Sequence, residues 1–511
     1  MLAKTWSAAI IGIKASPVEV EIHATEQGEQ TIVSIVGLPD TAVKESRDRV
    51  RSALHSSGFA HPRGSTLINL APAALKKEGA AFDLPIALGM LAATGVIDRQ
   101  LLSRTAIVGE LALDGSVRPV RGALPIALKI SKINEIDSLL VPYQNAEEAT
   151  LAAGNFPVFP IHNLRDAVAF FTEGNIFPYK ANLQQYIHKH QGEMADFDEI
   201  KGQGIARRAM EIAAAGGHNS LMIGPPGTGK SMIAKRLPGI LPPMSLQETL
   251  ETSQIHSVLG MLSTGEPLLN RRPFRSPHHT ISDVGLIGGG GNPAPGEISL
   301  AHNGVLFLDE LPEFKRNVLE VLRQPMEDNV VNITRAAGSY SFPANFMLVA
   351  AMNPCPCGLQ DPKLGCRCKP DEKRRYRNKI SGPLLDRIDL HVEVSQLSHD
   401  ELLAAPDGES SAQILERVIN ARKIQSKRFH GMRFHCNAGM TSKHLQKFCG
   451  LESQSQLLLR HAITNFNLSP RAYDRILKVA RTIADLANQE QISEDHLFEA
   501  ISYRSYDRTD W

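Results

Sequence analysis

The chain has 511 residues, of which 42% are hydrophobic and 21% charged, a composition typical of a folded protein with about three domains. Lys and Arg number 55 against 54 Asp and Glu, so the net charge is +1, and any nucleic-acid binding must rely on local basic patches. No stretch approaches the about 20 apolar residues of a membrane span, and six cysteines are too few for a disulfide framework. These features exclude an integral membrane protein and predict a cytoplasmic one with no membrane partner.

The first part of the chain, residues 1–172, alternates short strand-like and helix-like runs, which predicts an α+β or α/β domain. Within it, residues 18–22 and 31–36 flank a polar turn and predict a β-hairpin. Asp83 precedes an apolar run and is expected to cap a helix there. Residues 173–195 lose the periodicity and turn polar, which predicts a linker.

Two further regions follow the linker. An α/β pattern resumes over residues 196–395, and residues 396–511 have a helical pattern to the end of the chain. Buried strands are expected in three apolar runs, at residues 220–223, 305–308 and 346–351.

Residues 224–231 match the phosphate-binding loop that connects a strand to a helix. Glycines in such a loop let backbone N–H groups turn toward phosphates, the Lys230 ammonium reaches the β- and γ-phosphates, and the Ser231 hydroxyl reaches Mg²⁺. The alternative is a Gly/Pro turn with an incidental lysine. The predicted site for ATP and Mg²⁺ comprises Gly224, Pro225, Pro226, Gly227, Thr228, Gly229, Lys230 and Ser231.

The two later strands end in polar residues suited to ATP hydrolysis. The run 305–308 leads into Asp309, expected near Mg²⁺, and Glu310, expected to polarise the attacking water as a general base. Asn353 follows the third strand, where an amide can orient the water or contact the γ-phosphate. The alternative for Asn353 is a residue that closes a turn before Pro354.

Arg387 lies in a Leu-Leu-Asp-Arg segment and is a candidate arginine finger for the γ-phosphate of a neighbouring subunit. A finger of this kind stabilises the charge that develops in the transition state. A salt bridge from Arg387 to Asp386 or Asp389 is the alternative, and the residues alone do not decide between the two.

In this order, these elements resemble AAA+ ATPases of the magnesium-chelatase-like branch and, more narrowly, the ComM/YifB group. The resemblance covers essentially the whole chain, and three stretches carry it: Pro-Phe-Arg-Ser-Pro-His-His-Thr at 273–280, Gly-Glu-Ile-Ser-Leu-Ala-His-Asn-Gly at 296–304 and Leu-Ser-Pro-Arg-Ala at 468–472. It implies an α/β fold: an AAA+ P-loop core with a C-terminal helical lid, preceded by a Lon-peptidase-like α+β domain.

The resemblance also implies a hexameric ring with ATP at the subunit interfaces. Arg387 then acts in trans, and Arg471 becomes a second sensor, in the lid, that touches the γ-phosphate. Residues 198–203 resemble the segment that holds adenine, which assigns Ile200 and Gly202 to nucleotide binding.

The N-terminal domain resembles Lon-type peptidases around residues 109–120 but departs from their catalytic pattern. Ala81 stands where active members carry the Ser nucleophile, and the helix after Gly122 lacks a Lys at the position of the base. Because a Ser–Lys mechanism needs both groups, no proteolysis is expected. The domain is instead a candidate docking platform for a protein partner.

Two basic elements are candidates for DNA contact. The interval between Lys230 and Asp309 holds an insert, about 245–301, and residues 330–342 predict a hairpin. The resemblance implies that the insert points into the ring pore and that the hairpin grips DNA. Cations there would contact phosphates without reading sequence, and contacts between subunits are the alternative. The candidate residues are Arg272, Arg275, His278, His279 and Arg335.

Cys355, Cys357, Cys366 and Cys368 form two Cys-x-Cys pairs close together in the chain. Four thiolates could bind Zn²⁺ tetrahedrally beside Asn353. Cys-x-Cys is less typical of zinc than Cys-x-x-Cys, so a loop of free thiols is the alternative.

The family resemblance and the basic elements together favour a DNA motor. Such a ring would hydrolyse ATP on single-stranded or branched DNA, as a helicase or branch-migration enzyme in the recombination of DNA taken up by natural transformation. The alternative is an ATPase that remodels a protein partner, of the chelatase or unfoldase type. The missing aromatic pore loop after the P-loop helix argues against an unfoldase.

Overall fold

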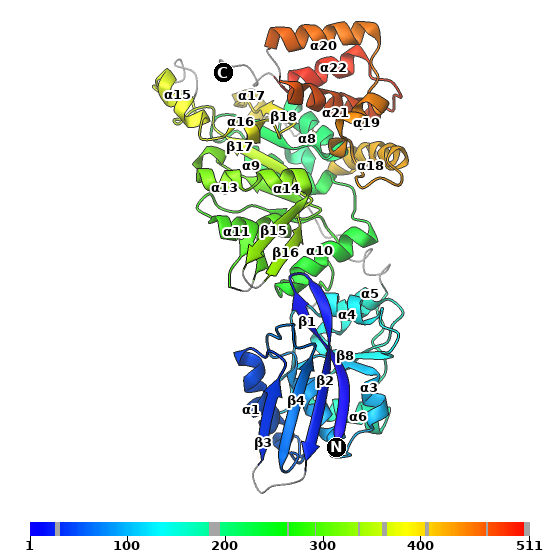
Figure 1. Cartoon of the computed structure of the whole chain (residues 1–511). Helices are drawn as coiled ribbons and strands as arrows, with labels where there is room; N and C mark the ends of the chain where they lie inside the picture. The colour runs from blue at the N-terminus through cyan, green and yellow to red at the C-terminus, as the bar shows by residue number, and fades with distance from the viewer. Residues whose placement is uncertain are drawn as a thin grey trace. The chain divides into compact units, whose positions relative to one another are not determined.

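The computed structural model describes residues 1–25, 31–182, 195–262, 265–291, 293–335, 338–359, 365–403, 408–466 and 469–504. The chain divides into two compact units (Figure 1). The first comprises residues 1–191 and 246–270, and the second residues 192–245 and 271–511. Most of the predicted linker, residues 183–194, lies outside the described residues. In the part of the chain that is described, no helix is long and apolar enough to span a membrane.

The first unit is built on a seven-stranded mixed sheet in the order β3-β4-β2-β1-β5-β8-β9. Its strands are β1 (Leu2–Ile11), β2 (Lys14–Thr25), β3 (Ile32–Val36), β4 (Ser65–Ala71), β5 (Thr105–Ile107), β8 (Ser138–Pro142) and β9 (Val158–Ile161). The hairpin predicted from residues 18–22 and 31–36 does not form. Instead β4 lies between β2 and β3, antiparallel to the former and parallel to the latter.

Helices and a short hairpin complete the first unit. They are α1 (Thr41–Ser56), α2 (Asp83–Ala93), α3 (Arg99–Ser103), β6 (Glu110–Leu111) paired with β7 (Val117–Arg118), α4 (Ala123–Ile130), α5 (Ala146–Ala153), α6 (Leu164–Thr172) and α10 (Leu246–Val258). All residues of α2 are buried, and Phe82, not Asp83, is its N-cap. The expected cap is wrong because the buried Asp83 carboxylate is bound elsewhere, accepting two hydrogen bonds from the Arg49 guanidinium at 2.7 and 3.0 Å.

Helix α10 belongs to the first unit although its sequence lies in the middle of the ATPase region. The Ser257 hydroxyl donates to Glu148 Oε2 at 3.0 Å, and the Gly122 backbone N–H donates to the Ser257 carbonyl at 3.0 Å. Asn145 Nδ2 donates to the other Glu148 oxygen at 2.7 Å. Burial raises the pKa of Glu148 to about 7 despite these hydrogen bonds. The first part of the insert is thus packed in the N-terminal unit.

Replacing Glu148 with Gln is expected to stabilise the protein at pH 8 but not at pH 4. Because the pKa of Glu148 is raised from 4.5 to about 7, the folded state favours the protonated carboxyl. The stability that this preference contributes is lost as the pH rises through 7. Raising the pKa from 4.5 to about 7 corresponds to at most about 3 kcal/mol of the free energy of unfolding. Thermal unfolding of Glu148→Gln and of the adjacent Glu147→Gln control checks this. Equal effects of Glu148→Gln at both pH values would contradict it.

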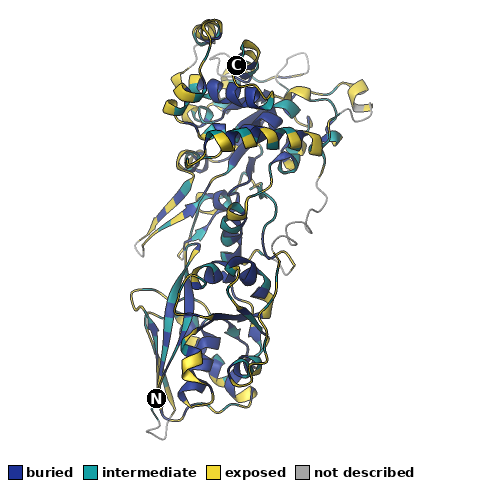
Figure 2. Ribbon diagram, turned by 90° about the vertical axis from the view of Figure 1, so that its right-hand side faces the viewer, coloured by how far each residue is buried: buried dark blue, intermediate teal, exposed yellow. Residues whose placement is uncertain are grey.

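The second unit contains a five-stranded parallel sheet in the order β11-β14-β17-β10-β18. The strands are β10 (Ser220–Ile223), β11 (Phe274–Arg275), β14 (Val305–Leu308), β17 (Met347–Met352) and β18 (Leu390–Glu393). Every residue of β10, β14 and β17 is buried, and Figure 2 shows buried residues concentrated in the strands and the helices against them. The carboxyl ends of parallel strands meet at one edge of the sheet, which is where such sheets place their sites.

The second unit also contains two hairpins, β12 (Gly288–Gly289) with β13 (Ala294–Pro295) and β15 (Val330–Arg335) with β16 (Gly338–Pro343). The helices around the sheet are α8 (Gly204–Gly216), α9 (Lys230–Arg236), α11 (Asp283–Ile287), α12 (Glu297–Leu300), α13 (Arg316–Glu320), α14 (Arg323–Asp328), α15 (Pro370–Arg377) and α16 (Gly382–Leu385). After β18 the described residues form helices: α17 (His399–Leu403), α18 (Ser411–Arg428), α19 (Ser442–Phe448), α20 (Ser453–Phe466), α21 (Pro470–Leu486) and α22 (Glu494–Ser502).

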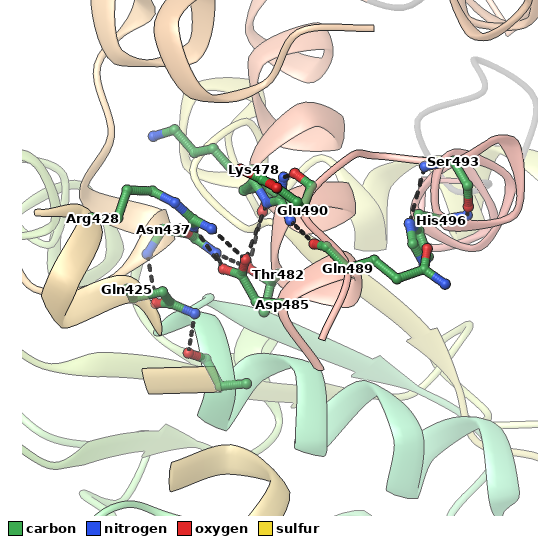
Figure 3. A network of polar contacts seen from close by, with 12 residues as sticks. Gln425, Arg428, Asn437, Lys478, Thr482, Asp485, Gln489, Glu490, Ser493 and His496 are labelled. Atoms are coloured by element: carbon green, nitrogen blue, oxygen red, sulfur yellow. Dashed lines mark hydrogen bonds and ion pairs between the residues drawn. The ribbon is translucent and has the colours of Figure 1, made fainter. Parts of the chain in front are cut away.

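A buried polar network joins the C-terminal helices α18 and α21 and connects α18 to α8 (Figure 3). Asp485 on α21 accepts two hydrogen bonds from Arg428 at 2.5 and 2.7 Å and one from Asn437 Nδ2 at 2.8 Å. Gln425 on α18 donates to the Ala215 carbonyl of α8 at 3.1 Å. Because a buried carboxylate is costly unless paired, this network fixes α18 and α21 in one arrangement.

Candidate nucleotide site

The phosphate-binding loop, residues 224–231, leaves the carboxyl end of β10 and runs into α9. Gly227 and Gly229 have φ values of +79° and +88°, a backbone region that favours glycine. Gly224 packs against Val394, the residue that follows β18, since a Cβ on Gly224 would lie 2.1 Å from the Val394 carbonyl oxygen. The local sequence therefore folds as a loop that only glycine-rich sequences adopt.

Lys230 and Asn353 lie side by side at this edge of the sheet. Lys230 Nζ donates to the carbonyl oxygens of Gly224 and Pro225, each at 2.7 Å, and lies 3.4 Å from Asn353 Oδ1. The Thr228 hydroxyl also donates to the Pro225 carbonyl, at 2.9 Å. Burial lowers the pKa of Lys230, because desolvation disfavours the charged amine. A bound phosphate would favour the charged ammonium and so oppose this lowering of the pKa.

Ser231 and the two acidic residues after β14 complete the group. The Ser231 hydroxyl donates to Asp309 Oδ2 at 2.6 Å, so the two predicted Mg²⁺ ligands are in direct contact. Glu310 has φ +53°, a strained backbone for a non-glycine residue, of the kind that clusters at functional sites. Its Oε2 lies 3.4 Å from His279 Nδ1, and the His279 ring lies against that of His278, with centroids 4.1 Å apart.

The predicted adenine segment lies beside the chain that follows β18. Ile200 is fully buried, and a Cβ on Gly202 would lie 2.8 Å from the Leu397 side chain. Gln203 donates to the Ser395 carbonyl at 2.6 Å. Residues 200–203 are therefore held by the segment that follows β18. Strand β18 pairs with β10, and the phosphate-binding loop follows β10.

Arg387 and Arg471 come together at one cavity. Arg471 Nη1 lies 3.5 Å from Asp386 Oδ2. Arg387 forms an ion pair with Glu327, whereas the salt bridge considered from the sequence is to Asp386 or Asp389. Both arginines line a cavity of about 110 Å³, and its described lining includes no residue of the phosphate-binding loop. The other lining residues are Glu327, Asp386, Asp474, Arg475 and Lys478.

The candidate DNA residues fall into two classes. Arg272 donates to the carbonyls of Pro242 and Asn303 at 2.7 and 2.8 Å, and Arg275 forms a two-point pair with Glu297 at 2.7 and 2.8 Å. These two guanidinium groups are engaged inside the unit. The second class comprises Arg335 and His278, whose side chains are exposed, whereas His279 contacts Glu310.

Arg335 is exposed at the end of β15, opposite Gly338 in the hairpin. Its Nη2 lies 3.3 Å from where a Cβ on Gly289 would be, so the hairpins β12–β13 and β15–β16 lie next to each other. Exposed His278 hydrogen-bonds Thr280 at 2.9 Å, in the segment that leads from β11 to these hairpins.

The four cysteines follow directly after Asn353, and each carries a thiol that is not in a disulfide. Their Sγ atoms lie within 4.8 Å of one another. The loop between the pairs includes residues 360–364, which lie outside the described residues.

Sequence reasoning missed two partners, His279 for Glu310 and Glu327 for Arg387. A signal for the first existed: β11 pairs in parallel with β14, so the residues after both strands meet at the same edge. Glu327 on α14 gave no such signal, because its contact with Arg387 depends on the tertiary packing.

Comparisons with known proteins match nearly the whole chain. Residues 196–402 match the family model described as magnesium chelatase subunit ChlI, residues 18–145 a second ChlI model, and residues 408–504 the model of the ChlI C-terminal part. The chain is 44% identical to competence protein ComM of Haemophilus influenzae, over 99% of this chain and 97% of that protein. It is 43% identical to the uncharacterized protein YifB of Salmonella typhimurium, over 99% and 98%.

A more distant match covers 44% of this chain and 22% of DNA replication licensing factor mcm6 of Dictyostelium discoideum, at 25% identity over 229 residues. The full-length matches to ComM and YifB are consistent with the loop and acidic residues gathered at the edge of the parallel sheet. The chain belongs to the ComM/YifB family of magnesium-chelatase-like AAA+ proteins.

Proposed function

We propose that the protein is a Mg²⁺-dependent ATPase that works as a hexameric ring motor on DNA. Its reaction would be helicase action or branch migration, in the recombination of DNA taken up by natural transformation. The observation that carries the ATPase part is the contact of Lys230 with Asn353 and of Ser231 with Asp309 at one sheet edge. Membership of a family that suggests ATPase activity supports it.

In this proposal each residue of the edge has a distinct task. Lys230 holds the β- and γ-phosphates, Glu310 polarises the attacking water, and Asn353 orients that water. Ser231 and Asp309 fit Mg²⁺, because their hydroxyl and carboxylate oxygens are the ligands it prefers. The ion would neutralise charge on the phosphate oxygens.

The placement of the two arginines supports a ring. Arg387 and Arg471 share a cavity whose described lining excludes the phosphate-binding loop, so in this proposal they act on the nucleotide of a neighbouring subunit. A positive pair brought to the γ-phosphate would stabilise the transition state only when subunits assemble.

The neighbouring hairpins support DNA contact. Gly289 carries no side chain beside exposed Arg335, which leaves room for a phosphate backbone to approach that guanidinium. His279 contacts Glu310 at 3.4 Å and belongs to the segment that leads to these hairpins. DNA that moves this segment would change the contact and release Glu310 for hydrolysis. The names of two similar proteins, a competence protein and a DNA replication factor, agree with a role on DNA.

The N-terminal unit is proposed to be a Lon-like domain without peptidase activity. Ala81 provides no nucleophile, and the nearby Asp83 carboxylate is buried against Arg49 rather than available to a substrate. The unit would then serve as a docking platform for a protein partner.

The deciding experiment measures ATP hydrolysis with and without single-stranded, duplex and branched DNA. DNA is expected to stimulate turnover, and Arg335→Ala is expected to remove most of the stimulation. If the ring binds phosphates through Arg335, the salt dependence of DNA binding should also weaken in the variant. The slope of log affinity against log salt concentration should fall in magnitude by about one for each phosphate that the variant no longer binds. The matched control is Arg104→Ala, an exposed arginine of the first unit paired with Asp137. Turnover indifferent to every DNA would overturn the motor in favour of protein remodelling.

A further inference from the structure

We propose that Cys355, Cys357, Cys366 and Cys368 form a structural Zn²⁺ site whose loop positions the phosphate-binding loop and Asn353. The geometry of the sulfur atoms is the first support. Three Sγ–Sγ separations are 3.4, 3.5 and 3.9 Å, and all four atoms lie within 4.8 Å of one another. Four sulfurs at about 2.3 Å from a tetrahedral zinc would be about 3.8 Å apart.

Two disulfides would produce a different pattern. Bonded sulfurs lie at about 2.05 Å, in two short pairs well separated from each other. Here Cys355 and Cys357 are both close to Cys366, so the cluster has no division into two pairs. Cys355 and Cys366 are also buried. When zinc binds, such thiols lose their protons, and the cation offsets the desolvation of the thiolates.

The loop that these cysteines hold rests against the nucleotide site. The Gly358 N–H donates to the Cys355 carbonyl at 2.9 Å, in a turn where Gly358 has φ +85°. A Cβ on Gly358 would lie 2.6 Å from the Pro226 side chain and 3.9 Å from Asn353 Cγ. The turn between the two cysteine pairs therefore contacts both the phosphate-binding loop and the residue beside Lys230.

The second cysteine pair leads into α15 on the other side of Asn353. Tyr376 on α15 is buried, and its pKa is raised to about 12, mainly by that burial. The backbone of Asn353 hydrogen-bonds this tyrosine. Zinc would thus join two segments that contact Asn353, one through Gly358 and the other through Tyr376 of α15. A flexible loop of free thiols would leave both contacts unfixed.

Metal content tests the site itself. The full-length protein, purified without chelators, is expected to carry one zinc per chain by mass spectrometry of the metal. The protein refolded or exchanged with Co²⁺ should show the thiolate charge-transfer and tetrahedral d–d bands. The double variant Cys355→Ser/Cys366→Ser should lose both signals, whereas Cys436→Ser, at a cysteine outside the cluster, should keep them. Wild-type protein without stoichiometric metal, or with disulfides among these four cysteines, would overturn the proposal.

Nucleotide binding tests the positioning, which rests on the proposed ATPase function. Gly358→Ala should keep its zinc but weaken binding of a fluorescent ADP analogue about tenfold, because the methyl group meets Pro226. Gly365→Ala is the matched control, at φ +95° in the same loop, with its Cβ no closer than 3.9 Å to Leu359. Equal affinity in both variants would overturn the positioning role. A wild-type protein that binds zinc but no nucleotide would instead contradict the ATPase proposal.

Discussion

Glu310→Gln is expected to lower the rate of ATP hydrolysis by about 10²- to 10⁴-fold while ATP still binds, because the amide cannot accept the proton of the attacking water. The substitution keeps the shape of the side chain and leaves the Ser231–Asp309 contact untouched. Single-turnover hydrolysis and equilibrium binding of ATP, measured separately, check the two halves of this prediction. ATP should stay trapped in the variant and stabilise the ring.

Two further variants make this result specific. Lys230→Ala should abolish hydrolysis because it removes the ammonium group that binds the phosphates, so its defect should appear in ATP binding. His279→Ala removes the partner of Glu310 and leaves Glu310, the proposed general base, in place. This variant should therefore have a higher turnover without DNA and a smaller stimulation of turnover by DNA. Wild-type turnover in Glu310→Gln or in Lys230→Ala would contradict the assignment of the site.

Arg387→Ala is expected to cost about 10³-fold or more in turnover, if the arginine stabilises the transition state of a neighbouring subunit. Its position in a cavity whose described lining includes no residue of the phosphate-binding loop gives this variant a distinctive property. A subunit with Lys230→Ala still offers an intact Arg387 to its neighbour, and a subunit with Arg387→Ala still has an intact loop. Mixing the two inactive proteins should therefore restore part of the activity.

The mixing experiment has a direct control. Pairing Lys230→Ala with Arg104→Ala, whose arginine forms an exposed ion pair in the first unit, should yield only the activity that the Arg104→Ala subunits supply. If mixtures of Lys230→Ala and Arg387→Ala stay inactive over a range of ratios, the action in trans is wrong. A further comparison is Glu327→Ala, which frees Arg387 from its ion pair and leaves the guanidinium in place.

The parts of the fold that could be predicted are those encoded by local sequence. Residues 220–223 and 305–308 form strands with the predicted bounds, because short, mostly apolar runs suit a buried parallel strand. The third strand, β17, begins and ends one residue later than predicted. The phosphate-binding loop is likewise local, since its glycines determine its backbone.

The predictions that failed depended on contacts between distant residues. The hairpin of 18–22 with 31–36 is wrong because β4, far along the chain, pairs with both strands. Asp83 is wrong as a cap because its partner is Arg49, which no local pattern indicates. Within the site, the ion pair of Arg275 with Glu297 likewise joins residues that are distant in the sequence, and no local pattern indicates it.

The route of the chain through helix α10 has a consequence for how the protein can be divided. The chain leaves the second unit after Ser245, contributes residues 246–270 to the first, and returns at Arg271. The two units are therefore joined by three covalent crossings rather than by one tether. A fragment that stops before Gly192 lacks one of its own helices and leaves Glu148 without Ser257. Conversely, severing the linker would not release the N-terminal unit, because α10 keeps it bound to the rest of the chain.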